Sequence, residues 1–449
     1  MSENSKKSVI IIGTGLVGSL CACFMAKRGY QVNVYEKRQD IRTGKEVRGK
    51  SINLALSHRG RNALRDVDLE EDILKTAIPL KGRFLHGING GLKSVIYDPI
   101  LKNCIYSLGR NYLNKKLLEA TNKYSNIKYH FEHMMTKCDL SKGTITFLDL
   151  KTCEEIQVTA DLIIGADGAH SKLRLYMQQM PQFQYTQTYI EHGYLELYIP
   201  PEKSCKMQPN HLHIWPRCEF MMIALPNQDS SWTVTLFMPF KIFYQLTKKE
   251  EVLRFFQDYF SDAVELIGKE QIVDVFLNTH PSQLISVKCS PYHAGSKFLI
   301  IGDAAHAMVP FYGQGMNAGF EDCFLLNKLL DKNNDNIVVT LDEYTQLRVR
   351  NAQAICDLAM YNYLEMRNLV NTTSFALRKI LDNQLFKLFP NLWIPLYNSV
   401  SFSTMDYQRC IENRKWQDNV CFIILYFTYP YFVRSLRNHL QEKYIFKTS

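Results

Sequence analysis

The sequence feature that most constrains the fold is a glycine cluster, Gly13-Thr14-Gly15-Leu16-Val17-Gly18, that follows a short apolar run. The preceding run, Val9–Ile12, is continuous and β-branched, as expected of a parallel strand buried on both faces. A helical stretch follows the glycines and ends at Gly29, and Gln31–Tyr35 then alternates like a second strand. These segments form a β-α-β unit, so an α/β fold with a Rossmann-like nucleotide-binding domain is the expected architecture.

The spacing of the three glycines has a physical explanation. Gly13 permits the tight turn after the strand, Gly15 lets a pyrophosphate approach the backbone, and Gly18 lets the helix pack closely on the strand. Phosphates are then favoured at the N-terminus of the helix, where free N–H groups and the helix dipole attract negative charge. Glu36, at the end of the second strand, can accept hydrogen bonds from ribose hydroxyls and disfavours a 2′-phosphate. The motif therefore predicts FAD or NAD rather than NADP.

A second motif distinguishes FAD from NAD. The strand-like run Lys297–Ile301 ends in Gly302-Asp303, and a glycine-rich turn, Pro310–Asn317, leads into a helix expected from about Ala318. An aspartate at such a strand end can bind a ribityl hydroxyl, and the N–H groups of the turn can stabilise the negative charge of a reduced flavin. The alternative interpretation is an ordinary strand-loop-helix turn, which requires two glycine-rich loops of this kind by chance.

Segments with strand-like alternation separate the two motifs. Arg83–Tyr97 is typical of a hairpin with its turn at Asn89-Gly90-Gly91, and Asp161–Gly165 is another apolar strand. Lys248–Leu266 is helical in pattern, as is the chain beyond about Glu343. Four further runs predict an antiparallel sheet: Tyr194–Ile199, His211–Trp215, Phe220–Leu225 and Thr233–Phe237.

The hairpin and the antiparallel sheet interrupt the dinucleotide-type strands, so the domains are expected to be discontinuous in sequence. We assign residues 1–75, 106–185 and 290–342 to the FAD-binding domain and residues 76–105 and 186–289 to a substrate domain. Residues 343–449 form a C-terminal helical region that is expected to cap the site.

Charge and cysteine content exclude some classes of protein. The 449 residues include 53 Lys and Arg against 44 Asp and Glu, a formal net charge of +9 that permits an acidic partner without selecting one. No nucleic-acid-binding motif accompanies that charge. The 12 cysteines include no Cys-x-x-Cys pair, which favours free thiols and argues against zinc-ribbon or thioredoxin-type chemistry. No residue spacing predicts a catalytic metal.

The N-terminal glycine motif, Asp167-Gly168 and Gly302-Asp303, in this order, resemble the single-component FAD-dependent aromatic hydroxylases of the para-hydroxybenzoate hydroxylase type. The similarity covers essentially the whole chain. Four further segments are similar to the members of that family that hydroxylate L-kynurenine, the last of them specifically so: Arg48–Ser57, His213–Arg217, Val309–Asp322 and Met360–Arg367.

The resemblance implies a reaction and its cofactors. L-Kynurenine, NADPH and O2 would give 3-hydroxy-L-kynurenine, NADP and water, with tightly bound FAD adding O2 at C4a and the hydroperoxide transferring oxygen to the aromatic ring. The protein would contribute position, electrostatics and the exclusion of water. Two alternatives stay open: a related monooxygenase or epoxidase that acts on another aromatic or lipid substrate, and a flavin-binding interaction module without turnover.

The resemblance also implies substrate contacts. Arg83 and Tyr97 match residues that bind the amino acid carboxylate, for which a guanidinium offers bidentate geometry. A three-residue turn would pair Arg83 with Tyr97 on one face of the hairpin, whereas a two-residue turn would place them on opposite faces. The other implied contacts are Asn362, Glu365, Met366 and Tyr397. The first three share one helix face, and an ordinary half-buried stripe is the alternative.

Phe311 and Tyr312 match residues beside the reacting face of the flavin and are the predicted catalytic pair. Asp167 belongs to a motif implicated in binding both FAD and NADPH. His213 and His306 suggest general bases, but both lie in motifs of the fold and are interpreted as structural. The predicted FAD contacts are Gly13, Gly15, Val17, Gly18, Glu36, Lys37, Arg38, Ala55, Arg110, Asp167, Asp303, Gly315, Met316 and Asn317.

Near the C-terminus, Val420–Val433 is an apolar aromatic run that is short for a spanning helix and contains Pro430. The pattern favours interfacial anchoring on anionic lipid, with a buried core helix as the alternative. The resemblance agrees, and it implies the mitochondrial outer membrane with the catalytic part facing the cytosol. Basic residues flank the run: Arg414, Lys415, Arg434, Arg437, Lys443 and Lys447.

Overall fold

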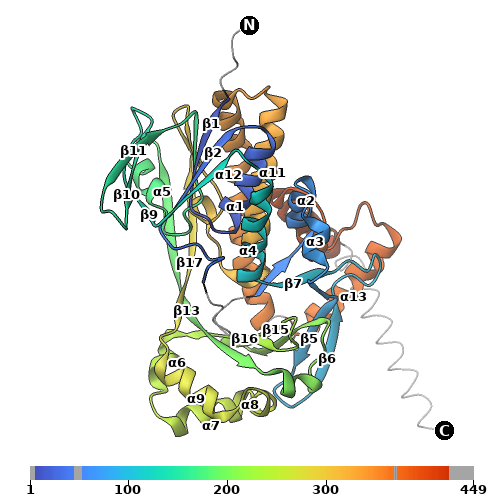
Figure 1. Ribbon diagram of the computed structural model, residues 1–449. Coiled ribbons are helices and arrows are strands. Elements are labelled where there is room, and N and C mark those ends of the chain that lie inside the picture. Colours follow the sequence, from blue (N-terminus) through green and yellow to red (C-terminus); the bar gives the residue numbers. More distant parts are fainter. Residues whose placement is uncertain (1–5, 45–52, 369, 371, 424–449) are drawn as a thin grey trace, which may run out of the picture.

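The glycine motif begins a parallel sheet in the computed structural model, which describes residues 6–44, 53–368, 370 and 372–423 (Figure 1). β1 (Ser8–Ile12) pairs in parallel with β2 (Gln31–Glu36), and α1 (Leu16–Lys27) connects the two strands. The sheet has six strands in the order β18-β19-β12-β1-β2-β8. Its other strands are β8 (Ile127–Phe131), β12 (Leu162–Gly165), β18 (His293–Ala294) and β19 (Phe298–Ile300).

Close packing of α1 on β1 depends on two glycines. A Cβ added at Gly18 would lie 2.0 Å from the carbonyl oxygen of Gly13, so no other residue fits there without movement of the backbone. Gly13 itself has φ of +101°, which L side chains rarely adopt. The predicted β-α-β unit is therefore confirmed, together with the reason for the spacing of its glycines.

A layer of helices covers the sheet. α1 packs against α4 (Arg110–Ala120) and α11 (Gly315–Lys332), and α11 also contacts α2 (His58–Asp66) and α12 (Ile337–Arg367). α11 begins about one turn earlier than predicted. A short helix, α10 (Asp303–His306), and a 3-10 turn, η3 (Pro310–Tyr312), join β19 to α11. α12 continues to the second sheet, where it contacts β14, β15 and β17 (Figure 1).

The second sheet has seven strands in the order β17-β13-β16-β15-β14-β5-β6. All neighbouring pairs are antiparallel except β14 and β5, which run in parallel. The predicted antiparallel sheet is therefore present, with one parallel pair that the sequence did not reveal. The strands are β5 (Gly82–His86), β6 (Leu92–Ile96), β13 (Gln184–Ile199), β14 (His211–Arg217), β15 (Phe220–Pro226), β16 (Trp232–Pro239) and β17 (Ser282–Ser290).

Four helices lie on the side of this sheet away from α1 and α11 (Figure 1). They are α6 (Phe240–Gln245), α7 (Lys249–Tyr259), α8 (Ser261–Ile267) and α9 (Lys269–Asn278). The prediction of one helix over Lys248–Leu266 was wrong, because α7 and α8 are interrupted at Phe260. That residue leaves the helical conformation and its ring is fully buried beside Phe220 of β15, so tertiary packing overrides a helical pattern.

The hairpin of β5 and β6 also differs from the prediction. Its turn spans Gly87–Gly91, closed by a 2.8 Å hydrogen bond from the N–H of Gly87 to the carbonyl of Gly91. Arg83 consequently pairs with Val95 rather than with Tyr97. Because strand side chains alternate, Tyr97 still lies on the same face as Arg83, and the Arg83 Cζ atom is 5.8 Å from the centre of the Tyr97 ring.

The C-terminal region is helical, as predicted, over α12, α13 (Thr373–Leu388), α14 (Leu396–Ser401) and residues 407–423. Residues 424–433 of the predicted membrane-associating run lie outside the described residues.

Two small sheets belong to the described part of the fold. One has β3 (Asn53–Leu56), β4 (Ile78–Leu80) and β7 (Ile105–Gly109), and the other has β9 (His133–Asp139), β10 (Thr144–Asp149) and β11 (Glu155–Thr159). The remaining short helices are α3 (Glu70–Leu74), η1 (Thr121–Lys123), α5 (Lys172–Met177) and η2 (Pro201–Lys206).

A buried carboxylate on α11 joins these layers. One Asp322 oxygen accepts a 2.7 Å hydrogen bond from the N–H of Gly302 and lies 2.6 Å from His306 Nε2, and the other lies 2.5 Å from Arg348 Nε. Burial alone would raise the pKa of Asp322, but His306 and Arg348 hold that pKa at about 2. The carboxylate therefore stays charged and fixes the turn between β19 and α10.

We expect Asp322→Asn to lower the free energy of unfolding by about 3–5 kcal/mol, because it leaves the buried Arg348 without its closest partner. The native carboxylate has a depressed pKa, so its contribution is present above pH ~4 and is lost as pH falls toward 2. Urea unfolding at pH 7 and pH 3 measures both effects. Asp342→Asn, which alters an exposed pair with His293, is the control and should change stability by less than about 0.5 kcal/mol. Equal stability of the two variants would contradict the prediction.

Candidate active site

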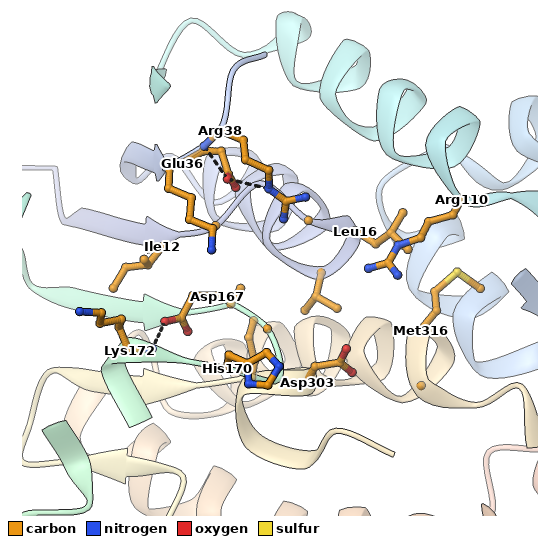
Figure 2. A pocket seen from close by; sticks show the side chains of 18 of the residues that line it. Ile12, Leu16, Glu36, Arg38, Arg110, Asp167, His170, Lys172, Asp303 and Met316 are labelled. Atoms are coloured by element: carbon orange, nitrogen blue, oxygen red, sulfur yellow. Dashed lines mark hydrogen bonds and ion pairs between the residues drawn. The ribbon is translucent and has the colours of Figure 1, made fainter. Parts of the chain in front are cut away.

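The larger of two adjoining cavities has a volume of about 360 Å³ and lies over the carboxyl ends of β1, β2, β12 and β19 (Figure 2). Ligands of open α/β sheets bind at this edge. Twelve of the predicted FAD contacts line it: Gly13, Gly15, Val17, Glu36, Lys37, Arg38, Ala55, Arg110, Asp167, Asp303, Gly315 and Met316. Gly18 and Asn317 do not, since Gly18 lies beneath the motif and Asn317 is fully buried.

Asn317 acts instead as a support of the cavity wall. Its side-chain oxygen accepts a 2.8 Å hydrogen bond from the N–H of Ser57. Its Nδ2 donates to the carbonyl oxygens of Ala55, at 2.8 Å, and Gly313, at 2.7 Å. Ala55 and Gly313 both line the cavity, so this amide holds two separate segments of the wall together.

Glu36 is fixed at the end of β2 by four hydrogen bonds. One carboxylate oxygen accepts from the N–H and the hydroxyl of Thr14, at 2.9 and 3.1 Å. The other accepts from the N–H and Nε of Arg38, at 2.9 and 3.3 Å. The carboxylate thus joins the glycine loop to the next strand while lining the cavity, as expected of a residue that faces a nucleotide ribose (Figure 2).

The charges and free polar atoms of this cavity fit an anionic dinucleotide such as FAD. Asp167 is a cavity residue whose Oδ2 accepts a hydrogen bond from the N–H of Lys172, whereas its buried Oδ1 has no partner among the described residues. Burial raises the pKa of Asp167. A ligand hydroxyl would satisfy that oxygen. Arg38 and Arg110 line the same space, and the N-terminus of α1 opens onto it at Leu16, so phosphates would meet both cations and free N–H groups (Figure 2).

The second cavity, of about 240 Å³, shares a wall with the first. The residues that line both are Asn53, Ala55, Met308, Pro310 and Gly313. Seven predicted substrate and catalytic residues line the second cavity: Arg83, Tyr97, Phe311, Tyr312, Asn362, Met366 and Tyr397. Glu365 does not, since it lines a smaller neighbouring cavity.

Arg83 is the cation of the second cavity, and it is only partly paired. Its Nη1 donates to Glu365 Oε1 at 3.0 Å and its Nη2 to Asn362 Oδ1 at 3.3 Å. Its buried Nε has no partner among the described residues, and neither has the buried hydroxyl of Tyr97. Burial alone would lower the pKa of Arg83, but the Glu365 carboxylate outweighs it and raises that pKa. The guanidinium is therefore a permanent cation, and its Nε and the Tyr97 hydroxyl are donors without a partner among the described residues.

The rest of the second cavity is apolar and aromatic. Phe311 stacks on Tyr363 with a centroid distance of 3.8 Å, and Tyr97 stacks on Tyr397 at 4.6 Å. The strand residues that form the floor were not predicted from the sequence, although their alternation along β15 and β16 marks one face of the sheet. They are Met221, Ile223, Leu225, Thr233, Thr235 and Phe237.

Neither histidine that suggests a general base lines these two cavities. His306 is bonded to Asp322, as described above. His213 Nδ1 lies 2.8 Å from His86 Nε2, and His86 Nδ1 lies 2.6 Å from Asp262 Oδ2. Burial and the neighbouring His86 lower the pKa of His213 to about 3, so it is neutral at physiological pH. The geometry agrees with the structural interpretation of both residues.

Known proteins are similar to this chain in sequence over most of its length. A family profile described as "FAD binding domain" matches residues 6–359. A kynurenine 3-monooxygenase from Drosophila willistoni is 55% identical over 421 residues, covering 93% of this chain and 92% of the relative. A kynurenine 3-monooxygenase from Sus scrofa is 47% identical over 427 residues, covering 95% of this chain and 90% of the relative.

Solved structures confirm the expected fold, an α/β FAD-binding domain with an interleaved antiparallel sheet and a helical C-terminal region. A tetrameric form of 2-methyl-3-hydroxypyridine-5-carboxylic acid oxygenase has a TM-score of 0.67 at 17% identity, covering 85% of this chain and 96% of that chain. A p-nitrophenol 4-monooxygenase from Pseudomonas putida has a TM-score of 0.66 at 16% identity, covering 90% and 98%. At these identities the likeness shows the fold alone.

We expect Gly18→Ala to weaken FAD binding, because the added methyl group collides with Gly13 and moves the N-terminus of α1. Overpacking of about 1–3 kcal/mol corresponds to a roughly 5- to 150-fold rise in the dissociation constant. Flavin release during equilibrium dialysis measures it. Gly91→Ala is the matched control, since nothing lies within 4 Å of its added Cβ. Equal flavin affinity of the two variants would show that the close approach is dispensable.

Proposed function

The chain belongs to the kynurenine 3-monooxygenases, and from this premise we propose that it hydroxylates L-kynurenine to 3-hydroxy-L-kynurenine with NADPH and O2 as co-substrates. The observation that carries the proposal is a buried, partly paired arginine in an apolar cavity that adjoins the FAD cavity. L-Kynurenine carries both an aromatic ring and an amino acid carboxylate, and the cavity offers a surface to each.

The carboxylate is recognised at Arg83 and Tyr97. The Nε of Arg83 and the hydroxyl of Tyr97 are buried donors without a partner among the described residues, and leaving each without an acceptor costs about 1–3 kcal/mol. A substrate carboxylate accepts from both. Arg83 and Tyr97 thus form a carboxylate clamp. Asn362 holds Arg83 in place, because its oxygen accepts from Arg83 while its Nδ2 donates to the carbonyl oxygen of Phe311 at 2.7 Å.

The ring is positioned toward the wall that the two cavities share. FAD, when bound in the first cavity, supplies the redox and oxygen chemistry of the reaction. Pro310 and Gly313 line both cavities, and Phe311 and Tyr312 lie between them in sequence and face the second. The aromatic side chains of this segment and Met308 exclude water from the space beside the shared wall, which favours hydroxylation over side reactions.

A lipid or other wholly apolar substrate fits this cavity less well. Such a substrate leaves the Arg83 donor and the Tyr97 hydroxyl unpaired, and the cost of burying those groups is not recovered. A carboxylate-bearing aromatic substrate is therefore favoured over the epoxidase alternative.

We expect Arg83→Met to reduce kcat/KM for L-kynurenine by about 30- to 1000-fold, because removing one partner of a buried charge pair costs roughly 2–4 kcal/mol. Tyr97→Phe keeps the ring and loses only the hydroxyl, so it should cost about 1 kcal/mol, roughly fivefold. Kynurenine-stimulated NADPH oxidation measures both. An Arg83→Met enzyme with unchanged KM would favour the substrate without a carboxylate.

We also propose that the C-terminal run holds the catalytic part on the cytosolic face of the mitochondrial outer membrane. The support is chemical: an apolar aromatic run at residues 420–433 with basic residues on both sides. At the described start of the run, Phe422 and Ile423 are exposed at the end of the helix over residues 407–423. No helix within the described part of the chain is long and apolar enough to cross a membrane.

Deleting the residues after Asn419 is expected to move the protein from the membrane pellet to the supernatant of a cell extract, because it removes both the apolar run and the basic residues after it. Replacing Arg434 and Arg437 with Gln should weaken binding to anionic vesicles by about 1 kcal/mol per charge. Vesicle co-sedimentation at two ionic strengths measures this effect. A full-length protein that already stays in the supernatant at low salt would contradict the proposal.

A further inference from the structure

A third, smaller cavity of about 70 Å³ adjoins the substrate cavity. Tyr312, Asn362 and Tyr397 line both and form the partition between them. Glu365 and Lys379 line the small cavity and not the larger one. The small cavity lies between α12, which carries Asn362 and Glu365, and α13, which carries Lys379. It therefore brings a set of charged residues to the back of the carboxylate clamp.

Glu365 reaches Arg83 from this side. Its Oε1 accepts the 3.0 Å hydrogen bond from Arg83 Nη1. A substrate carboxylate that approaches Arg83 from the larger cavity meets a guanidinium that already has an anionic partner. Two carboxylates on one buried guanidinium repel each other in a medium of low dielectric constant. Tight binding of the substrate thus requires another cation for Glu365.

Lys379 is a cation without a partner at this place. Its ammonium group makes no hydrogen bond or ion pair with the residues that the structure describes. Burial lowers its pKa, and the charge of Arg83 lowers it further, whereas Glu365 raises it, so Lys379 lies within electrostatic reach of both members of the Arg83–Glu365 pair. A half-buried lysine without an ionic partner is available to a carboxylate that loses its own partner.

The other charges around the small cavity already have partners, since the two arginines that line it, Arg378 and Arg414, pair with Asp382 and Asp418. Asp382 accepts 2.9 Å hydrogen bonds from Arg378 Nε and Trp393 Nε1. Asp98 is fully buried and accepts from the backbone N–H groups of residues 100 and 101 and from Asn103. Among the carboxylates that interact with Lys379, Glu365 is thus the one whose partner the substrate can replace.

We propose that Lys379 is a positioning residue that takes over Glu365 when the substrate carboxylate binds Arg83, an exchange of ion pairs that rests on the proposed function. Before binding, Arg83 is paired with Glu365 and Lys379 is unpaired. After binding, Arg83 is paired with the substrate and Glu365 with Lys379. A ligand without a carboxylate leaves the Arg83–Glu365 pair closed, so the exchange contributes to substrate selection.

The test measures the dissociation constant of L-kynurenine for the FAD-loaded enzyme from the change in flavin absorbance. Lys379→Met should raise that constant by about tenfold, because Glu365 then keeps competing for Arg83. The rate of flavin reduction at saturating L-kynurenine should stay within about twofold of wild type, since Lys379 lies behind the clamp. Lys379→Arg should restore most of the affinity. Lys387→Met, an exposed lysine on the same helix, is the matched control and should not change the constant.

A double-mutant cycle with Glu365→Gln distinguishes an exchange of ion pairs from a simple attraction of the substrate carboxylate by Lys379. In the Glu365→Gln background no carboxylate competes for Arg83, so Lys379→Met should change the constant by less than about twofold. The decarboxylated analogue of L-kynurenine should bind wild type and Lys379→Met equally.

An unchanged affinity of Lys379→Met, or a loss of the same size in both backgrounds, would overturn the proposal. Wild-type turnover of L-kynurenine is measured in the same series. Its absence would reject the proposed function itself, whereas normal turnover with an additive cycle would reject only the ion-pair exchange.

Discussion

The charge on Asp322 is the constraint on which the positions of the other parts depend. A carboxylate at this depth is tolerated only because an arginine, a histidine and a backbone N–H surround it; the N–H and the histidine come from the two ends of α10, and the arginine comes from α12. The N–H belongs to Gly302, at the turn where the FAD cavity begins, and Arg348 belongs to the helix that continues to the substrate cavity. One buried anion therefore fixes the relative position of the two cavities.

The same network continues to the C-terminal region. Glu321, next to Asp322, pairs with Arg348 at 2.7 Å and with Arg59 at 2.5 Å. The Arg59 Cζ atom lies 3.9 Å from the centre of the Tyr407 ring, and the Tyr407 hydroxyl is 3.2 Å from Gln314, beside the turn into α11. The region that closes the substrate cavity is thus held by the segment that binds the cofactor. Replacing such a network with apolar residues could preserve stability, but it would lose the geometric relation between the parts.

The sequence predicted what is determined locally. The glycines of the first motif are required by contacts within about ten residues, and the motif, its helix and Glu36 lie as expected. The prediction of the hairpin turn was wrong, because the length of the turn depends on a hydrogen bond between Gly87 and Gly91 that the residue types do not determine. The break at Phe260 depends on a ring packed by distant segments. No pattern in the sequence singled out Lys379, because its proposed role depends on Glu365, which lies fourteen positions away on another helix.

The wall shared by the two large cavities has a consequence for how the active protein is assembled. Asn53, Ala55, Met308, Pro310 and Gly313 each line both spaces, so a ligand in the first cavity that moves any of them also changes the lining of the second. Cofactor binding and substrate binding are thus coupled through five shared residues, so the substrate meets a different surface in the protein with and without its cofactor.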